Sequence, residues 1–310
     1  AAKNLPRTNW NIITQSKKDG GLLGFIGYKI GMKSAYVKDE TAHSMMKGKR
    51  IIIPVTLIEC PPLKILSVRV YKNGKIIKEA MNEHLEKELS RKITLPKTQK
   101  SLETFLANIE KNHADYDDVR MIVYSLVKKT ALKKRPDISE IGLSGSMHEK
   151  IAFVKQHMHK ELHIKDFATD EVVKKGLIDL RGVTKGKGFQ GSTKRFGLDL
   201  LPHKTEKGIR GPGSGGAWHP ARVEFRQPMA GQMGFFTRIV YNSKIIHVGD
   251  IQKNPEANEH IFHHFGKINT DYVVLAGSVQ GAVKRPLLLT APLRPTKKQI
   301  KKNFEFIELR

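Results

Sequence analysis

Cysteine is almost absent from this chain: Cys60 is the only one among 310 residues. A single thiol excludes an internal disulfide and any zinc site built from cysteines, and it is typical of a protein from a reducing compartment. Long apolar runs are lacking as well. The sequence has no stretch of 18 or more apolar residues and no secretory hydrophobic segment near its start, so we expect a cytoplasmic protein without a membrane partner.

Acidic residues are scarce relative to basic ones. The chain has 30 Asp and Glu against 55 Lys and Arg, which gives a formal net charge of +25. Such an excess strains an isolated globule by self-repulsion and indicates a polyanionic partner. A membrane surface is the competing polyanion, but neither end of the chain carries a lysine-flanked amphipathic helix. The charge therefore favours a nucleic acid.

Residues 181–238 combine glycine and positive charge with little hydrophobic periodicity. They contain twelve of the 26 glycines and eleven Lys and Arg against three acids. Apolar residues here follow neither the period of a strand nor that of a helix, so the segment cannot build a core of its own. Half of it, fully extended at about 3.3 Å per residue, spans roughly 95 Å. We expect a finger that leaves the body and is held by a partner.

The remaining sequence predicts a mainly β fold, a β-barrel with an α/β insertion. Strand patterns occupy 22–37, 51–60, 65–72, 118–127 and 286–290, and helical spacing appears within 79–115 and at 148–158. Two hairpins are predicted, at Asn73-Gly74 and around Asn242-Ser243. We expect a barrel body from 22–77 and 166–310, an insertion at 78–165, and the finger at 181–238.

Residues 1–21 are polar and basic. They read as an extended basic arm in which Trp10 is a stacking anchor, or equally as a frayed terminus.

Gly186 to Gly191 match the G-x-G-x-x-G pattern of a dinucleotide-binding loop. That pattern must open a helix and be followed by an acid about twenty residues later, at the end of a second strand. Here Gly197 and Pro202 interrupt the following segment, and no acid has that context. The glycines instead let the backbone approach phosphates, with lysines adding charge.

The sequence contains no motif that is typical of an enzyme active site. The histidines near residues 157–163 and 260–264 lack the spacing and the partner acid of a metal site, and no nucleophile motif is present. We therefore predict no metal, cofactor or small-molecule substrate. The alternative is an RNA-modifying enzyme with a basic substrate channel, which would need a cofactor pocket or a catalytic dyad.

Trp218 and His219 follow a run of glycines, Gly211 to Gly216 interrupted by proline and serine. A tryptophan at the tip of such a flexible segment is suited to stacking on unpaired bases, each worth about 1 to 3 kcal/mol, and RNA offers such bases more often than duplex DNA. The alternative is a side chain folded back on the barrel.

Five motifs carry a family resemblance: RGVTKGKGFQG, LPHKTEKGIRG, GAWHPARV, AGQMGFFTR followed by YNSKIIHVGD, and GFIGYKIGMKSAYV near the start. Together they resemble the large-subunit ribosomal protein L3 family in its archaeal and eukaryotic branch. The resemblance implies a translation-protein-type β-barrel with an inserted α/β region and a long loop that penetrates 23S-type ribosomal RNA (rRNA) toward the peptidyl transferase centre. It also implies a role in early subunit assembly, neighbouring large-subunit proteins as partners, and magnesium only through the rRNA.

Transferred by position, the resemblance implies that Trp218 and His219 form the finger tip, that Lys204 to Arg210 form a basic loop beside it, and that Arg222 contacts phosphate. The full set of expected RNA-binding residues is Trp10, Arg181, Lys185, Lys187, Lys194, Arg195, His203, Lys204, Lys207, Arg210, Trp218, His219, Arg222, Arg226, Gln232 and Arg238.

Overall fold

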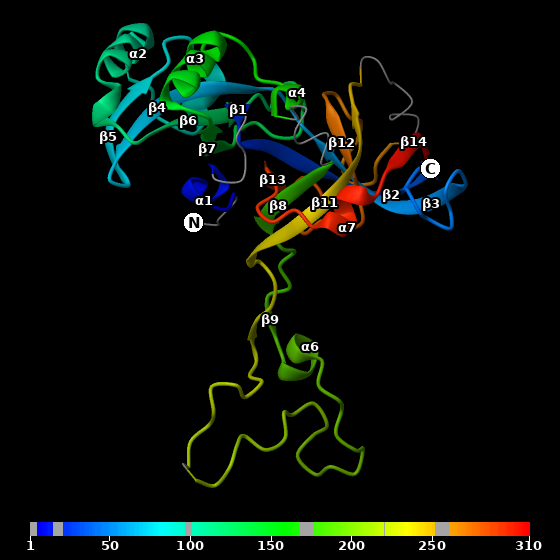
Figure 1. Ribbon diagram of the computed structural model, residues 1–310. Helices are drawn as coiled ribbons and strands as arrows, with labels where there is room; N and C mark the ends of the chain where they lie inside the picture. The colour runs from blue at the N-terminus through cyan, green and yellow to red at the C-terminus, as the bar shows by residue number, and fades with distance from the viewer. Residues whose placement is uncertain (1–4, 15–20, 97–100, 168–175, 220, 252–260) are drawn as a thin grey trace.

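A computed structural model of the chain describes residues 5–14, 21–96, 101–167, 176–219, 221–251 and 261–310. Figure 1 shows a two-part body of sheets and short helices from which one long excursion extends. The strands of the body are β1 (Gly21–Leu22), β2 (Gly24–Asp39), β3 (Arg50–Glu59), β4 (Leu63–Lys72), β5 (Lys75–Met81), β6 (Asp118–Ser125), β7 (Ile138–Ser144), β8 (Leu177–Val183), β11 (Thr237–Gly249), β12 (Tyr272–Ala276), β13 (Pro286–Thr290) and β14 (Phe304–Leu309).

Helices in the described part are few and short. They are α1 (Trp10–Thr14), α2 (Leu102–Lys111), α3 (Met147–His157), α4 (Ile164–Phe167), α6 (Ser192–Phe196), α7 (Lys297–Lys301) and the 3₁₀ turns η1 (Lys87–Arg91) and η2 (His113–Asp115). The predicted helix at 148–158 is confirmed, and a capping box between Ser146 and Glu149 fixes its start. The fold is mainly β, as the sequence predicts.

A closed barrel forms the larger half of the body. Its strands pair in the order β13-β8-β11-β12-β3-β2, and an additional pairing of β13 with β2 closes the circle. Closure is possible because β2 is 16 residues long: Gly24–Tyr28 pairs with β13, and Ala35–Asp39 pairs with β14. Closing the sheet gives β13 a neighbour on both sides, β8 on one and β2 on the other.

The second half is a five-stranded sheet in the order β1-β7-β6-β4-β5. Apolar residues of α2 and α3 pack on one of its faces, and the segment containing η1 packs on the other through Leu89. Residues 63–77 therefore belong to this sheet and not to the barrel, where the sequence pattern had placed them. The boundary lies near Pro61-Pro62 and not at residue 78.

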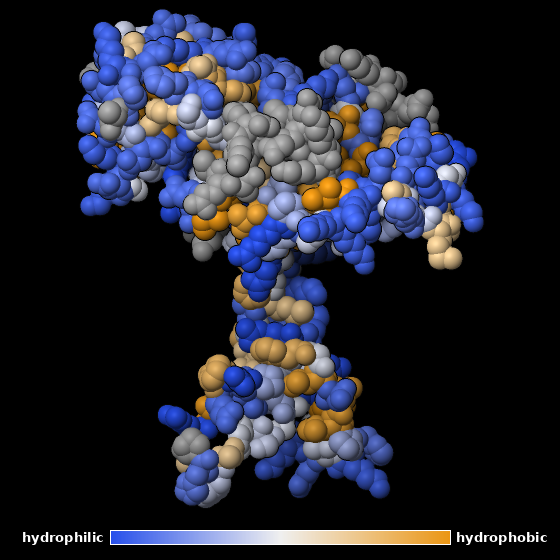
Figure 2. Space-filling view, viewed as in Figure 1, coloured by the Kyte–Doolittle hydropathy of each residue, from blue (hydrophilic) through white to orange (hydrophobic). Residues whose placement is uncertain are grey.

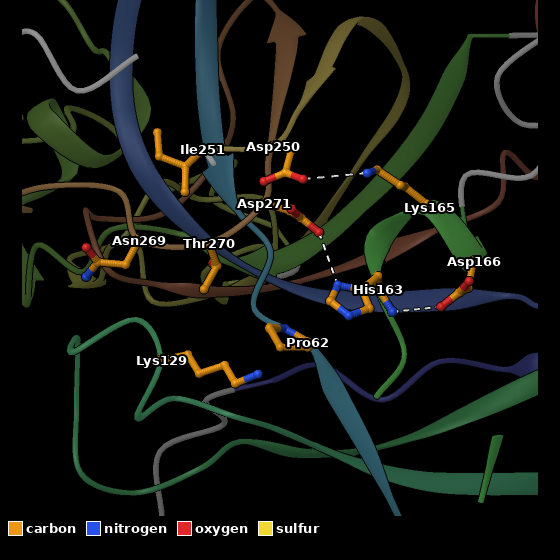
Figure 3. Close-up of a pocket in the computed structure, with 10 residues that line it drawn as sticks. All are labelled: Pro62, Lys129, His163, Lys165, Asp166, Asp250, Ile251, Asn269, Thr270 and Asp271. Carbon is orange, nitrogen blue, oxygen red and sulfur yellow. Dashed lines mark hydrogen bonds and ion pairs between the residues drawn. The ribbon is translucent and has the colours of Figure 1, made fainter. Parts of the chain in front are cut away.

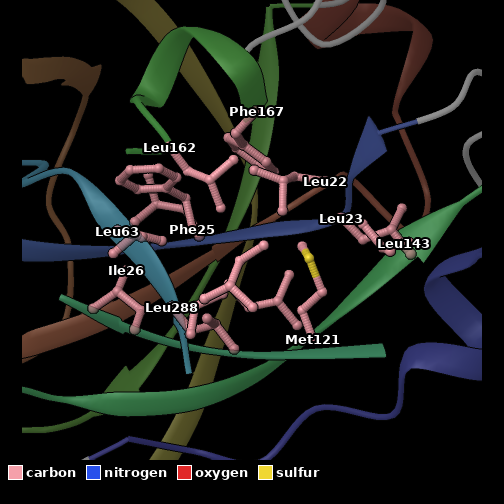
Figure 4. Close-up of a cluster of buried hydrophobic side chains, with 14 of the residues drawn as sticks. Leu22, Leu23, Phe25, Ile26, Leu63, Met121, Leu143, Leu162, Phe167 and Leu288 are labelled. Atoms are coloured by element: carbon pink, nitrogen blue, oxygen red, sulfur yellow. The ribbon is translucent and has the colours of Figure 1, made fainter. Parts of the chain in front are cut away.

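One continuous core joins the two halves. Phe25 and Leu288 from the barrel pack with Leu63, Met121 and Leu143 from the five-stranded sheet (Figure 4). Because both sheets contribute to the same buried cluster, they form a single packing unit. The root of the finger is thus attached to a body with one shared core.

Only one of the two predicted hairpins is present in the structure. The Asn73-Gly74 hairpin is confirmed, with positive φ at both residues as a two-residue turn requires. The predicted hairpin at Asn242-Ser243 is wrong: β11 runs through it, and the register shift between Val240 and Ser243 marks a β-bulge. Asn242 has a positive φ, which a bulge and a turn both accommodate.

The extended-arm interpretation is wrong for the part of residues 1–21 that contains Trp10. Trp10 begins α1 and is only 2 % exposed. A Cβ atom on Gly24 would lie 2.6 Å from its ring, and one on Gly142 would lie 3.0 Å from its Cβ. The indole therefore fills a glycine-lined slot between the two sheets and is not available for stacking on RNA. Residues 1–4 and 15–20 lie outside the described part.

Candidate nucleic-acid interface

The finger leaves the barrel at the end of β8 and returns at the start of β11. Its stem is a narrow two-strand ribbon in which β9 (Phe189–Gln190) pairs with β10 (Gly231–Gln232) (Figure 1). Backbone bonds from Thr184 N to Phe236 O at 2.9 Å and from Lys187 N to Met233 O at 2.9 Å hold the two sides together nearer the body. The stem therefore has its own hydrogen bonds although it has almost no core.

Glycine at 234 is required by the closeness of these two strands. Gly234 has φ of 72°, and a Cβ built there would lie 2.0 Å from the carbonyl oxygen of Lys185. Any side chain would force the strands apart. The glycine content that marks the finger in the sequence thus has a specific function at the stem.

Arg195 ties α6 to the returning strand. Its Nε donates to the carbonyl of Gln232 at 3.2 Å, and its terminal nitrogen donates to the carbonyl of Met229 at 2.8 Å. The left-handed Gly197, with φ of 70°, ends α6. Beyond this crosslink, the described part of residues 197–230 forms turns and bends without helix or strand.

The tip exposes its large apolar side chains to solvent. Trp218 is 86 % exposed and Phe225 is 92 % exposed. Figure 2 shows hydrophobic residues scattered among hydrophilic ones over the lower part of the molecule. The alternative in which Trp218 folds back on the barrel is therefore wrong. Water does not favour exposed aromatic rings, and such surfaces mark binding sites.

The positive charges of the finger have no acidic partners. Every ion pair between described residues joins two residues outside 181–238. The guanidinium of Arg195 is satisfied by carbonyls, which leaves its charge uncompensated. A row of exposed cations with no internal counter-ion is suited to a polyanion.

Most of the expected RNA-binding residues lie on this exposed surface. Arg195 is half-buried, and the other members are exposed: Lys185, Lys187, Lys194, His203, Lys204, Lys207, Arg210, Trp218, His219, Arg222, Arg226, Gln232 and Arg238. Gln232 directs its side-chain amide to the carbonyls of Met233 and Gly234, so it also braces the stem. These residues form one continuous segment of chain and not a set converging on a pocket.

Arg181, like Trp10, was expected to bind RNA and is instead buried. It is buried in β8, where its Nε donates to Thr290 Oγ1 at 3.4 Å. Burial lowers the pKa of its guanidinium, and the nearby Asp179 acts in the opposite direction. Arg181 therefore serves the interior of the barrel, as Trp10 serves the seam between the sheets.

Exposed phenylalanines are candidates that the sequence reasoning missed. Phe189 is 76 % exposed and Phe225 is 92 % exposed. Arg226 lies 5.4 Å from the ring of Phe225, and Arg195 lies 5.0 Å from the ring of Phe196. A ring beside a guanidinium offers a base both a stacking face and a positive charge. The signal was present as aromatic residues next to arginine in a segment that cannot bury them.

A cavity of about 670 Å³ is a candidate active site for the alternative of an RNA-modifying enzyme (Figure 3). His163 Nδ1 lies 3.3 Å from Asp271 Oδ2, which resembles part of a catalytic dyad. The hydroxyl in this cavity, that of Thr270, donates to the buried Glu59 at 3.2 Å and is not directed at the histidine. Lys165 lies 3.7 Å from Asp250 and Lys129 lies 2.6 Å from Glu161, so both lysines of the cavity have acidic partners. The arrangement lacks a nucleophile activated by its base.

The described part contains neither a metal-binding cluster nor a membrane-spanning helix. No group of three or more histidine, cysteine or acidic side chains there could hold a metal ion. No helix among the described residues is long and apolar enough to cross a membrane. The histidine group containing His260 falls partly outside these residues.

Comparison with known proteins finds relatives over nearly the whole chain. Residues 11–310 match the family described as Ribosomal protein L3. The chain is 38 % identical over 293 residues to the large ribosomal subunit protein uL3 of Methanocaldococcus jannaschii, covering 90 % of this chain and 84 % of that protein. It is 35 % identical to uL3 of Methanobrevibacter smithii, with coverages of 96 % and 89 %, and 36 % identical to uL3 of Thermoplasma acidophilum, with coverages of 92 % and 86 %.

Proposed function

Because this chain belongs to the ribosomal protein L3 family, a family of structural proteins and not of enzymes, we propose that its finger binds large-subunit rRNA and extends toward the peptidyl transferase centre. The chain is a structural constituent of the large ribosomal subunit. In the proposal, the barrel docks on the rRNA surface and the finger fills a crevice within it. By ordering RNA around the finger, the protein supports early assembly of the subunit.

The observation that carries the proposal is the exposed, uncompensated charge of the finger. Residues 181–238 have a net charge of +8 by count and contain no ion pair between described residues. Their aromatic rings are exposed as well. Phosphates supply the missing counter-ions, and unpaired bases supply flat partners for the rings. A protein surface would satisfy the rings but not so dense a row of cations.

Trp218 and His219 are proposed to be the part of the finger nearest the peptidyl transferase centre. The family resemblance implies this placement, and neither side chain has a catalytic partner among the described residues. In this proposal, Trp218 positions RNA by stacking and takes no part in peptide-bond chemistry. Lys204, Lys207 and Arg210 neutralise the phosphates beside it.

Salt titration of binding to purified large-subunit rRNA tests this proposal. Six to ten phosphate contacts predict a loss of affinity of roughly 10³ to 10⁵ between 50 and 200 mM salt. A chain in which residues 185–236 are replaced by a short Gly-Ser turn should show a much flatter response with unchanged thermal unfolding of the body. If the shortened chain kept the full salt dependence, the finger would not be the RNA-binding element.

A further inference from the structure

The finger accounts for only part of the excess charge. It contributes a net +8, so the other 252 residues retain a net +17 of the +25 total. These residues form the body, where many acids are engaged in ion pairs. This remaining positive charge indicates that the body also contacts a polyanion.

A cleft beside η1 gathers five cations around one acid. Its volume is about 570 Å³, and its charged walls are Lys87, Glu88 and Arg91 from η1 and Lys128, Lys133 and Lys134 from the loop after β6. The 670 Å³ cavity that contains His163 is different, since His163 and Lys165 there lie beside Asp271 and Asp250. Local charge therefore distinguishes the η1 cleft as an anion site.

The cations on the rim of the η1 cleft are free to bind. Lys87, Lys128 and Lys134 are exposed and form no ion pair with a described residue. The terminal nitrogen of Arg91 reaches the carbonyl of Lys134 at 3.4 Å, which joins the two walls. A phosphate entering the cleft would thus meet positive groups from two separate elements.

Lys133 lies deeper and has a different role. It pairs with the buried Asp137 and sits 4.9 Å above the ring of Tyr28 in β2. Burial lowers the pKa of its ammonium group, and the neighbouring cations Lys92 and Arg285 act in the same direction while Asp137 opposes them. An anion in the cleft would relieve this mutual repulsion of cations.

The same cations connect the cleft with the root of the finger. Arg285, which lies in the field of Lys133, also sits 5.6 Å from the ring of Phe235 in the stem. Its carbonyl accepts the backbone N–H of Lys29 at 3.1 Å. Lys29 is half-buried, and its ammonium donates to the carbonyls of Val279 and Gly281. Arg285 also precedes Pro286, the register partner of Tyr28, whose ring lies under Lys133. Arg285 therefore stands between the stem and the η1 cleft.

We propose that the η1 cleft is a second RNA-binding site, which holds phosphates of an RNA backbone that continues from the finger root across Arg285. This inference rests on the proposed function, because the RNA is the same rRNA. The ligand class is a phosphodiester backbone, read by charge and not by base sequence. The cleft adds a contact on the body and leaves the role of the finger unchanged.

Three triple variants, each of which removes three positive charges, separate the two sites. The cleft variant is Lys87→Gln with Lys128→Gln and Lys134→Gln. The finger variant is Lys204→Gln with Lys207→Gln and Arg210→Gln. The control is Lys47→Gln with Lys49→Gln and Lys75→Gln, which are exposed, form no ion pair with a described residue and lie outside both surfaces. Thermal unfolding of all three should stay close to that of the parent chain.

Each variant is titrated with purified large-subunit rRNA at several salt concentrations. Losing three phosphate contacts should lower the slope of log affinity against log salt by roughly 2 to 3, at 0.7 to 0.9 per contact. We expect this for the cleft and finger variants and a change below about 1 for the control. If only the finger variant differs from the control, the cleft proposal is overturned and the proposed function stands. If neither differs, both fail.

A fluorophore on Ser90→Cys distinguishes RNA from an acidic protein partner. Ser90 is exposed on η1, and the native Cys60 is fully buried, so labelling is confined to the cleft. Single-stranded RNA should change the fluorescence, and the combined Lys128→Gln and Lys134→Gln substitutions should abolish the change. Poly-L-glutamate at equal charge concentration should have little effect. A response to poly-L-glutamate and none to RNA would assign the cleft to an acidic polypeptide and overturn the proposal.

Discussion

The body buries its largest side chains and contains all the ion pairs of the described residues, whereas the finger exposes its aromatic rings and has no ion pair among them. Trp10 in the body is 2 % exposed, and Trp218 in the finger is 86 % exposed. Arg120 in the body touches Asp118 and Glu140, while Lys204 and Lys207 in the finger have no acidic partner among the described residues. The comparison teaches that the body carries its own stabilising contacts, and that those of the finger must come largely from outside the chain.

The two tryptophans provide the largest expected contrast. Trp10→Ala should lower the free energy of unfolding by about 3 to 5 kcal/mol, because it leaves a cavity between Gly24 and Gly142 at the seam of the two sheets. Trp218→Ala should change it by less than about 0.5 kcal/mol. Denaturant unfolding of both variants measures the difference. Equal losses would mean that the finger tip contributes to the core.

The pH dependence of stability should originate in the body. Burial raises the pKa of Glu59 to about 7, against an ordinary value near 4.5. Its Oε1 accepts bonds from the backbone of Asn269 and Thr270, and its Oε2 is buried without a partner among the described residues. The folded protein therefore holds an extra proton between these two pH values. Its stability should fall as pH rises from about 4.5 to about 7 and be level above that.

Glu59→Gln tests this expectation, because the amide mimics the protonated acid and keeps an acceptor for the same backbone groups. The difference in unfolding free energy between pH 5 and pH 8 should shrink by on the order of 2 kcal/mol. Glu206→Gln in the finger is the matched control and should leave the pH profile unchanged. An unaltered profile in Glu59→Gln would remove Glu59 as the source.

Aromatic rings in the finger should matter for RNA and not for folding. Phe225→Ala should weaken binding to large-subunit rRNA by about 1 to 3 kcal/mol, because it removes a stacking face beside Arg226. Phe225→Trp should retain the affinity, and Phe225→Leu should not. Equal affinities for the Leu variant and the parent would show that the ring acts only as an apolar group.

The smallest expected effect concerns the stem. Arg195→Lys keeps the charge but loses the planar group that donates to Met229 and Gln232. Amide exchange at Met233, whose N–H bonds Gly188 at 2.8 Å, should accelerate by up to about fivefold, which is roughly 1 kcal/mol. Thermal unfolding of the body should not change. Unchanged exchange would mean that the ribbon does not depend on Arg195.

Much of this architecture could be read from local patterns. The strand at 22–37, the Asn73-Gly74 turn and the irregular finger each follow from residues close together in sequence. The sheet membership of Leu63–Met81 could not, because a strand pattern does not say which partner strand it joins. The bulge at Asn242 has the same positive φ as a turn, so composition alone does not separate the two.

Burial of candidate residues was equally hidden from the sequence. The slot for Trp10 is formed by Gly24 and Gly142, and the environment of Arg181 includes Thr290, so both depend on contacts between distant residues. Within the finger, such contacts are few. For that reason the exposure of the finger residues could be predicted from composition and motif more reliably than that of the body residues.

A photoreactive benzophenone amino acid in place of Trp218, incorporated into assembled large subunits, tests the central claim most directly. The same amino acid at Ile77, exposed on β5 of the body, serves as the control. We expect the label at position 218 to crosslink to rRNA near the peptidyl transferase centre, at nucleotides that the label at position 77 does not reach. Crosslinks from position 218 to protein alone, or none to rRNA, would contradict the proposal that the finger is held by RNA.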